Sequence, residues 1–190
     1  MGPMHSTDMT AEDRQRLRQI AWSSIDYALD HAGPMRLDAD SLSGVLAEPG
    51  ASFVTLTLNG VLRGCIGSLQ AMRPLAEDVA ENAYSAAFRD PRFHPLTKDE
   101  RVSCELEISV LTPPESFPVA SEDDLVRRLI PSEHGVILRW RQRRATYLPS
   151  VWDMLPDPRR FVRELKKKAG LSEEFWDPEM EVSVYRAIKF

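Results

Sequence analysis

The dipeptide Asn59-Gly60 restricts the fold of this 190-residue chain more than any other feature of its sequence. It separates two segments of strand-forming residues, 53–58 and 61–66. Asn-Gly in such a place is a strong signal for a two-residue β-hairpin, because both residues adopt positive φ at low cost. The sequence therefore predicts two antiparallel strands in which the residues that flank the turn face each other.

The register of this hairpin decides where the side chains of its second strand point. A two-residue turn places Leu56 opposite Arg63. It also places Val54 opposite Cys65. Because cross-strand partners share one face of a sheet, we expect Arg63 and Cys65 to project together beside the two apolar residues.

The second strand carries the segment Leu62-Arg63-Gly64-Cys65-Ile66-Gly67, called the LRGCIG motif below. Strands normally avoid glycine, because it packs no side chain and costs backbone entropy. Two glycines, one on each side of a thiol, therefore predict that a ligand or another stretch of backbone approaches this strand closely.

Helical and strand patterns follow one another along the chain without a regular βαβ order. Helices are predicted between residues 10 and 33, 74 and 89, 121 and 129, and 157 and 169, and strands over 53–58, 61–66, 103–111, 135–140, 145–148 and 182–190. This order favours an α+β fold with a mainly antiparallel sheet and flanking helices. We expect one domain over 10–190, made of two closely packed subdomains with a boundary near 112–120, after a flexible tail at 1–9.

Composition excludes several classes of protein. The net charge of −5 argues against a general nucleic-acid binder. No apolar run approaches the ~20 residues of a membrane helix, and residues 1–9 lack the pattern of a signal peptide. Cys65 and Cys104 are too few for a disulfide framework, and the four histidines show no zinc-ligand spacing. We therefore expect a cytoplasmic protein with free thiols and no metal site.

Eight blocks of sequence carry a resemblance to a known family. They are Phe53–Leu56, Leu62–Gly67, Pro74–Val79, Ala86–Phe93, Glu107–Leu111, Arg144–Pro149, Val151-Trp152 and Lys168–Leu171. Together and in this order they resemble the AMMECR-one domain family, whose bacterial and archaeal members are called AmmeMemoRadiSam system protein A.

The resemblance implies an α+β fold of two subdomains, with the LRGCIG motif lining a surface between them. It also implies a genomic association with a Memo-like protein and a radical-SAM protein as partners. It supplies no established reaction, and any cofactor is unknown. The sequence departs from the family at His94, where proline is more usual, so no role for His94 is carried over.

Cys65 is the candidate catalytic residue. A thiolate is a strong nucleophile, and a neighbouring cation such as Arg63 would lower the pKa of the thiol. The backbone N–H groups around Ile66-Gly67 could also bind an anion. The alternative is that Cys65 is a small apolar residue on a tight strand, as we expect for Cys104.

Arg63 needs a partner, because a buried guanidinium without one costs several kcal/mol. Glu105 and Glu107 are the expected carboxylates, either in a structural ion pair or beside an anion clamp. We assign to the expected cleft Arg63, Gly64, Ile66, Gly67, Glu107, Arg144 and Thr146.

These residues leave several functions open. The leading hypothesis is a protein that acts with Memo-like and radical-SAM partners through this cleft. The alternatives are a stand-alone thiol enzyme that uses Cys65 on an anionic substrate, and a protein-binding scaffold without catalysis. A thiol enzyme would need a base such as His94 or His134, although both are expected at the surface. Nucleic-acid binding through the arginine-rich turn at 139–144 is the weakest alternative.

Overall fold

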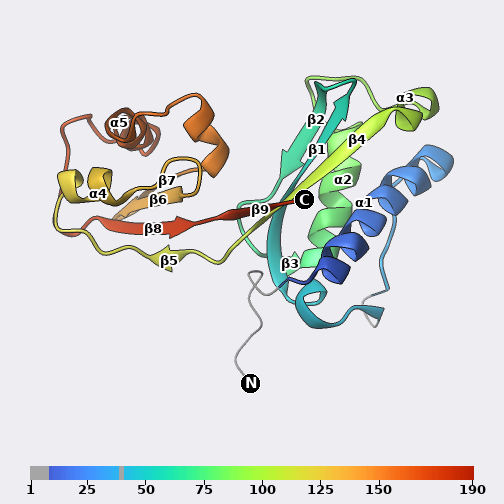
Figure 1. The fold of residues 1–190 in the computed structure, drawn as a ribbon, viewed down its shortest axis with the longest axis horizontal. Coiled ribbons are helices and arrows are strands. Elements are labelled where there is room, and N and C mark those ends of the chain that lie inside the picture. Colours follow the sequence, from blue (N-terminus) through green and yellow to red (C-terminus); the bar gives the residue numbers. More distant parts are fainter. Residues whose placement is uncertain (1–8, 39–40) are drawn as a thin grey trace. The chain divides into compact units, whose positions relative to one another are not determined.

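The computed structural model describes residues 9–38 and 41–190, and the chain divides into two compact units (Figure 1). Unit 1 consists of the residues up to Thr112 together with Ile188–Phe190, and unit 2 consists of Pro113–Ala187. Each unit combines helices with an antiparallel sheet. The predicted α+β class is thus confirmed.

Unit 1 is a sheet with two long helices packed on it (Figure 1). Its strands are β1 (Pro49–Leu58), β2 (Val61–Gly67), β4 (Cys104–Leu111) and β9 (Ala187–Lys189), in the order β2-β1-β4-β9, with the short β3 (Arg73–Pro74) paired to the start of β1. Its helices are α1 (Ala11–His31), α2 (Leu75–Phe88) and α3 (Lys98–Val102), with a 3₁₀ turn, η3 (Gly44–Leu46). Strand β2 is therefore an edge strand.

The first helix forms where the sequence predicts it. The hydroxyl of Thr10 accepts a hydrogen bond from the backbone N–H of Asp13, and the Asp13 carboxylate accepts one from the Thr10 N–H, which makes a complete capping box. The predicted apolar stripe, which begins at Leu17, is buried. Of the expected tail, residues 1–8 lie outside the described residues, whereas Met9 is buried in the core of unit 1.

Unit 2 has its own sheet and its own core. The strands are β5 (Glu115–Ser116), β6 (Gly135–Trp140), β7 (Arg143–Tyr147) and β8 (Glu181–Tyr185), in the order β5-β8-β6-β7. The helices are α4 (Glu122–Arg128), η4 (Pro149–Asp153) and α5 (Pro158–Lys168). Trp152 stacks on Phe161 with 3.8 Å between ring centroids, and both rings are buried.

The structure differs from the predicted elements in two places. The expected final strand over 182–190 is two strands, β8 in the sheet of unit 2 and β9 in the sheet of unit 1. Helix α3 was not predicted, although Thr97 and Glu100 at its start form a complete capping box. Its five residues are too few to show an apolar period, so only the cap could have indicated it.

The hairpin turn is as predicted. Asn59 and Gly60 both have positive φ, 52° and 77°, as a two-residue turn of this kind requires. Leu58 pairs with Val61 across the turn. The start of the predicted register is therefore correct.

The rest of the predicted register is wrong, because β2 contains a β-bulge. Leu56 pairs with Gly64 rather than with Arg63, which is the extra residue of the bulge. Every residue after the bulge moves to the opposite face. Cys65 consequently pairs with Thr55, on the face away from the core, and does not share a face with Val54.

Gly64 occupies the position where β2 passes closest to α2. A Cβ added to this residue would overlap the backbone carbonyl oxygen of Ala86. The close approach that the glycines predicted is thus made here by the chain's own helix. No side chain of any size fits between the strand and the helix.

Replacing Gly64 by alanine is therefore expected to lower the free energy of unfolding by at least about 2 kcal/mol, since strand and helix must move apart. Gly33→Ala is the matched control, because an added Cβ meets nothing within 4 Å there. Urea unfolding of both variants measures the difference. Equal stability of the two variants would show that the approach to Ala86 is not a real constraint.

Within the described residues, 9–38 and 41–190, no helix has the length and hydropathy needed to cross a bilayer.

Candidate functional site

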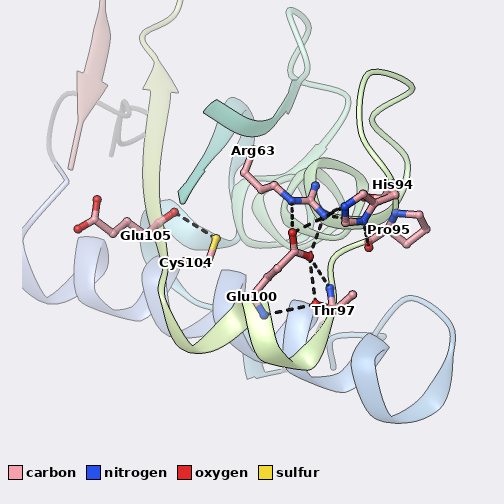
Figure 2. A network of polar contacts seen from close by, with 7 residues as sticks. All are labelled: Arg63, His94, Pro95, Thr97, Glu100, Cys104 and Glu105. Atoms are coloured by element: carbon pink, nitrogen blue, oxygen red, sulfur yellow. Dashed lines mark hydrogen bonds and ion pairs between the residues drawn. The ribbon is translucent and has the colours of Figure 1, made fainter. Parts of the chain in front are cut away.

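The side chain of Arg63 reaches α3 and forms a bidentate ion pair with Glu100 (Figure 2). The Nε atom donates to one carboxylate oxygen at 2.9 Å, and Nη2 donates to the other at 3.0 Å. Nη2 also donates to the backbone carbonyl of His94 at 2.9 Å. Because the Arg63 side chain is only 7% exposed, this pair is the main compensation for burying its charge.

The same pair sets the charge of Glu100. Its hydrogen bonds from Arg63, aided by bonds from the N–H and hydroxyl of Thr97, lower the pKa of Glu100 to about 2. Glu100 is therefore ionised over the whole physiological range. The prediction that Glu105 or Glu107 pairs with Arg63 is wrong. The bulge at Arg63 directs its side chain to Glu100 on α3 instead.

One guanidinium nitrogen of Arg63 remains without a hydrogen bond. Among the described residues, Nη1 is buried and has no acceptor. The ring of Phe93 lies beside the guanidinium, with its centroid 5.7 Å from Cζ. This cation–π contact accounts for part of the lost solvation.

His94 is the solvent-exposed member of this network (Figure 2). Its side chain is 70% exposed, and its Nδ1 atom lies 2.9 Å from the carbonyl oxygen of Pro95 and 3.2 Å from Nη2 of Arg63. The expectation of a surface histidine is thus confirmed for His94. It is wrong for His134, which is 5% exposed and whose pKa is lowered by burial.

The backbone of Cys65 is held by two side chains from the loop after α2. Its N–H donates to Asp90 Oδ2 at 2.9 Å, and its carbonyl accepts from Nη2 of Arg92 at 3.3 Å. Asp90 is buried, and its hydrogen bonds from Arg92 hold the pKa of this carboxyl well below its usual range. These side chains occupy the edge of β2, where an unprotected strand would offer free backbone groups.

The side chain of Cys65 points the other way, to the outer face of the sheet. It is half-buried, and its Sγ accepts a hydrogen bond from the hydroxyl of Thr55 at 3.3 Å. Thr55 in turn pairs with Glu107 on β4. Cys65, Thr55 and Glu107 therefore form a row across three strands, called the outer row below.

The remaining motif residues pack within unit 1. A Cβ on Gly67 would overlap the ring of Phe53, and Ile66 packs against the core of unit 1. The second cysteine, Cys104, is buried as predicted, and burial raises the pKa of its thiol. Figure 2 shows that Sγ of Cys104 contacts the carbonyl oxygen of Glu105.

Two expected cleft residues lie on β7 in unit 2, whereas the others lie in unit 1. The hydroxyl of Thr146 lies 3.0 Å from that of Tyr185, and burial raises the pKa of Tyr185. Arg144 is exposed.

A buried polar network fixes the other end of β2 to α2. Asp78 accepts hydrogen bonds from the backbone N–H and the hydroxyl of Ser52, from the hydroxyl of Ser68 and from the amide of Asn82. Asp78 is 1% exposed. Nothing local in the sequence distinguishes a buried carboxylate at this position from an exposed one.

The chemistry available at the outer row is limited. Over the described part of the chain, no group of three histidine, cysteine or acidic residues could hold a metal ion. In the same residues, the only hydrogen bond to Sγ of Cys65 comes from Thr55, and none joins it to a histidine or a carboxylate. The row can contact a ligand or a partner, but it does not form a nucleophile–base pair.

Comparisons with known proteins agree on one family. The sequence profile of the AMMECR1 family, the AMMECR-one family of the sequence analysis, matches residues 18–190. A protein of Methanothermobacter thermautotrophicus is 35% identical over 188 residues, which cover 97% of this chain and 96% of that protein. Protein MK0488 of Methanopyrus kandleri is 33% identical, with coverage of 96% and 89%.

A solved structure resembles this one. The crystal structure of the uncharacterised protein PH0010 from Pyrococcus horikoshii matches with a TM-score of 0.73 and 30% sequence identity. The match covers 92% of this chain and 88% of the other.

The ion pair of Arg63 leads to a prediction about stability. Glu100→Gln keeps the capping geometry but leaves the buried guanidinium without its counter-charge, and is expected to lower the free energy of unfolding by about 3 kcal/mol at neutral pH. Asp30→Asn is the control, because it breaks an ion pair with Lys98 whose side chains are 60% and 68% exposed, and it is expected to cost much less stability than Glu100→Gln.

The pH dependence of stability provides a second readout of this variant. The folded pKa of Glu100 is about 2 against an ordinary value of 4.5, so its contribution is complete above pH 4.5 and is lost as the pH falls toward 2. The wild-type protein should therefore lose more stability over this interval than Glu100→Gln. Parallel pH profiles of the two proteins would contradict the assigned ion pair.

Proposed function

Because the chain belongs to the AMMECR1 family, we propose that it acts in the cytoplasm with a Memo-like protein and a radical-SAM protein, and that the outer face of the unit 1 sheet makes the functional contact. The observation that carries this proposal is the outer row, Cys65, Thr55 and Glu107. These side chains lie on one face of three adjacent strands; Cys65 and Thr55 are partly exposed and Glu107 is exposed.

The internal contacts of the LRGCIG motif favour a contact surface over a complete active site. Arg63 is occupied by Glu100, Gly64 by the backbone of α2, and the Cys65 backbone by side chains of the following loop. These contacts hold β2 rigidly and present the outer row from a fixed scaffold. A surface built on strands is better defined than one built on loops.

The distribution of charge supports a partner or ligand with a basic group. Unit 2 contains thirteen acidic and thirteen basic residues, so the net charge of −5 belongs to unit 1. Glu107 lies in the outer row, with Glu105 two residues before it on the same face. Such a face attracts cations over a distance of about 10 Å at moderate salt.

Recovery of partners from native lysate tests this proposal. The tagged full chain should recover a Memo-like and a radical-SAM protein, and Thr55→Lys should reduce their recovery at least about tenfold, because it places a bulky cation in the middle of the outer row. Ser23→Lys is the matched control at an exposed position of α1. The proposal fails if neither partner is recovered, or if both variants behave alike.

A specific contact favours a second function, that of a thiol enzyme. The Thr55 hydroxyl donates a hydrogen bond to Sγ of Cys65 and so orients the thiol on the outer face of the sheet. Arg92, which binds the Cys65 carbonyl, adds a positive charge nearby.

Alkylation of the native protein tests this second function. Iodoacetamide should modify Cys65 at least about tenfold faster than Cys104, because Cys104 is buried and the pKa of its thiol is raised. Mass spectrometry of the peptides separates the two sites. Resistance of Cys65 to the reagent, or full activity of a reconstituted system that contains Cys65→Ser, would rule out thiol catalysis.

A further inference from the structure

A pocket of about 410 Å³ lies beside the outer row, at the edge of the unit 1 sheet. It is lined by Arg18, Thr55, Thr57, Glu105, Leu106, Glu107 and Phe190. Its size falls within the ~300–1,000 Å³ typical of small-molecule sites. Thr55 and Glu107 belong both to the pocket and to the outer row, so a molecule in the pocket would contact the outer row.

Leu106 of β4 is one of the residues that line the pocket. On β4, Ile108 exchanges both backbone hydrogen bonds with Phe190. Alternation along an antiparallel strand turns the N–H and carbonyl of Leu106 to the same side as those of Ile108. The backbone N–H and carbonyl of Leu106 therefore point to the side of β4 on which Phe190 lies.

The pocket also holds charges of both signs. Arg18 lies over the ring of Phe190, with 5.8 Å from Cζ to the centroid. In the described residues, no ion pair joins Arg18 to either carboxylate of the pocket. Glu105 accepts a hydrogen bond from the hydroxyl of Thr57 at 3.4 Å, and Glu107 forms a long ion pair with Nζ of Lys189, at 3.9 Å.

We propose that this pocket binds a free α-amino acid with an apolar side chain. The carboxylate of the ligand would pair with Arg18 and the N–H of Leu106, and its amine with Glu107 and Glu105. The ring of Phe190 would receive the apolar side chain. This inference rests on the proposed function, in that it names the ligand class for the same face of the sheet.

Other ligand classes fit the pocket less well. A phosphate or a simple carboxylate would be repelled by two glutamates, and a simple amine would leave Arg18 unpaired. The described residues of the pocket include no trio of metal-binding side chains. A zwitterion offers a partner to both signs of charge in the pocket.

Titration of the full chain with L-leucine, followed by NMR of the backbone amides, tests the inference. Saturable shifts should appear at Leu106 and Glu107 below about 10 mM. L-leucinamide lacks the carboxylate and 4-methylpentanoate lacks the amine, so each should bind at least about tenfold more weakly. Equal binding of either analogue, or no shift with L-leucine, would overturn the inference.

Paired variants locate the site. Arg18→Gln and Glu107→Gln should each weaken L-leucine binding at least about tenfold, because each removes one of the two charges that hold the zwitterion. Arg16→Gln, on the same helix, and Glu115→Gln, in unit 2, are matched controls at exposed positions and should bind as the wild type does. Unchanged binding in Glu107→Gln would also overturn the inference.

The inference and the proposed function can fail separately. Partner recovery is scored without added amino acid, and L-leucine binding is scored without partners. Recovery of both partners with no L-leucine binding would reject the ligand class alone. Binding of L-leucine with neither partner recovered would reject the assembly and leave the pocket assigned.

Discussion

The buried ion pair between Arg63 and Glu100 is the interaction on which the motif depends. It joins β2, the edge strand of unit 1, to α3, just before β4 begins. Without Glu100 the bulge at Arg63 would place an unpaired guanidinium in the protein interior, at a cost of several kcal/mol. The pair therefore fixes the bulge, and the bulge decides which residues of the motif face outward.

This constraint separates the motif into two functional parts. Arg63 and Gly64 serve the fold, because their contacts are with α3 and α2. Cys65 serves it only through its backbone, which is bound by Asp90 and Arg92. Its side chain is left on the outer face beside Thr55, where a ligand or a partner can reach it.

The sequence predicted the elements of the fold better than the details of the site. The Asn59-Gly60 turn and the capping box of α1 depend on local chemistry, and both are correct. The bulge could not be predicted, because the contacts that accompany it, of Arg63 with Glu100 and of Gly64 with Ala86, join residues that are far apart in the sequence.

The partner of Arg63 was missed for a related reason. Glu105 and Glu107 were expected because they lie on a neighbouring strand, whereas Glu100 lies on a helix of five residues that has no apolar period. Its capping box with Thr97 was the one local signal. Long-range ion pairs such as this depend on where the chain returns, which a single sequence does not specify.

Native-state hydrogen exchange of the Cys65 amide tests the central claim most directly. An edge-strand amide without a hydrogen bond exchanges readily with solvent. The Cys65 amide, which donates to Asp90, should exchange only when a large part of unit 1 unfolds. We predict that the free energy of exchange at Cys65 approaches that of global unfolding and falls in Asp90→Asn. Exchange as fast as at the exposed hairpin tip, Gly60, would contradict the claim that the loop after α2 holds the motif in place.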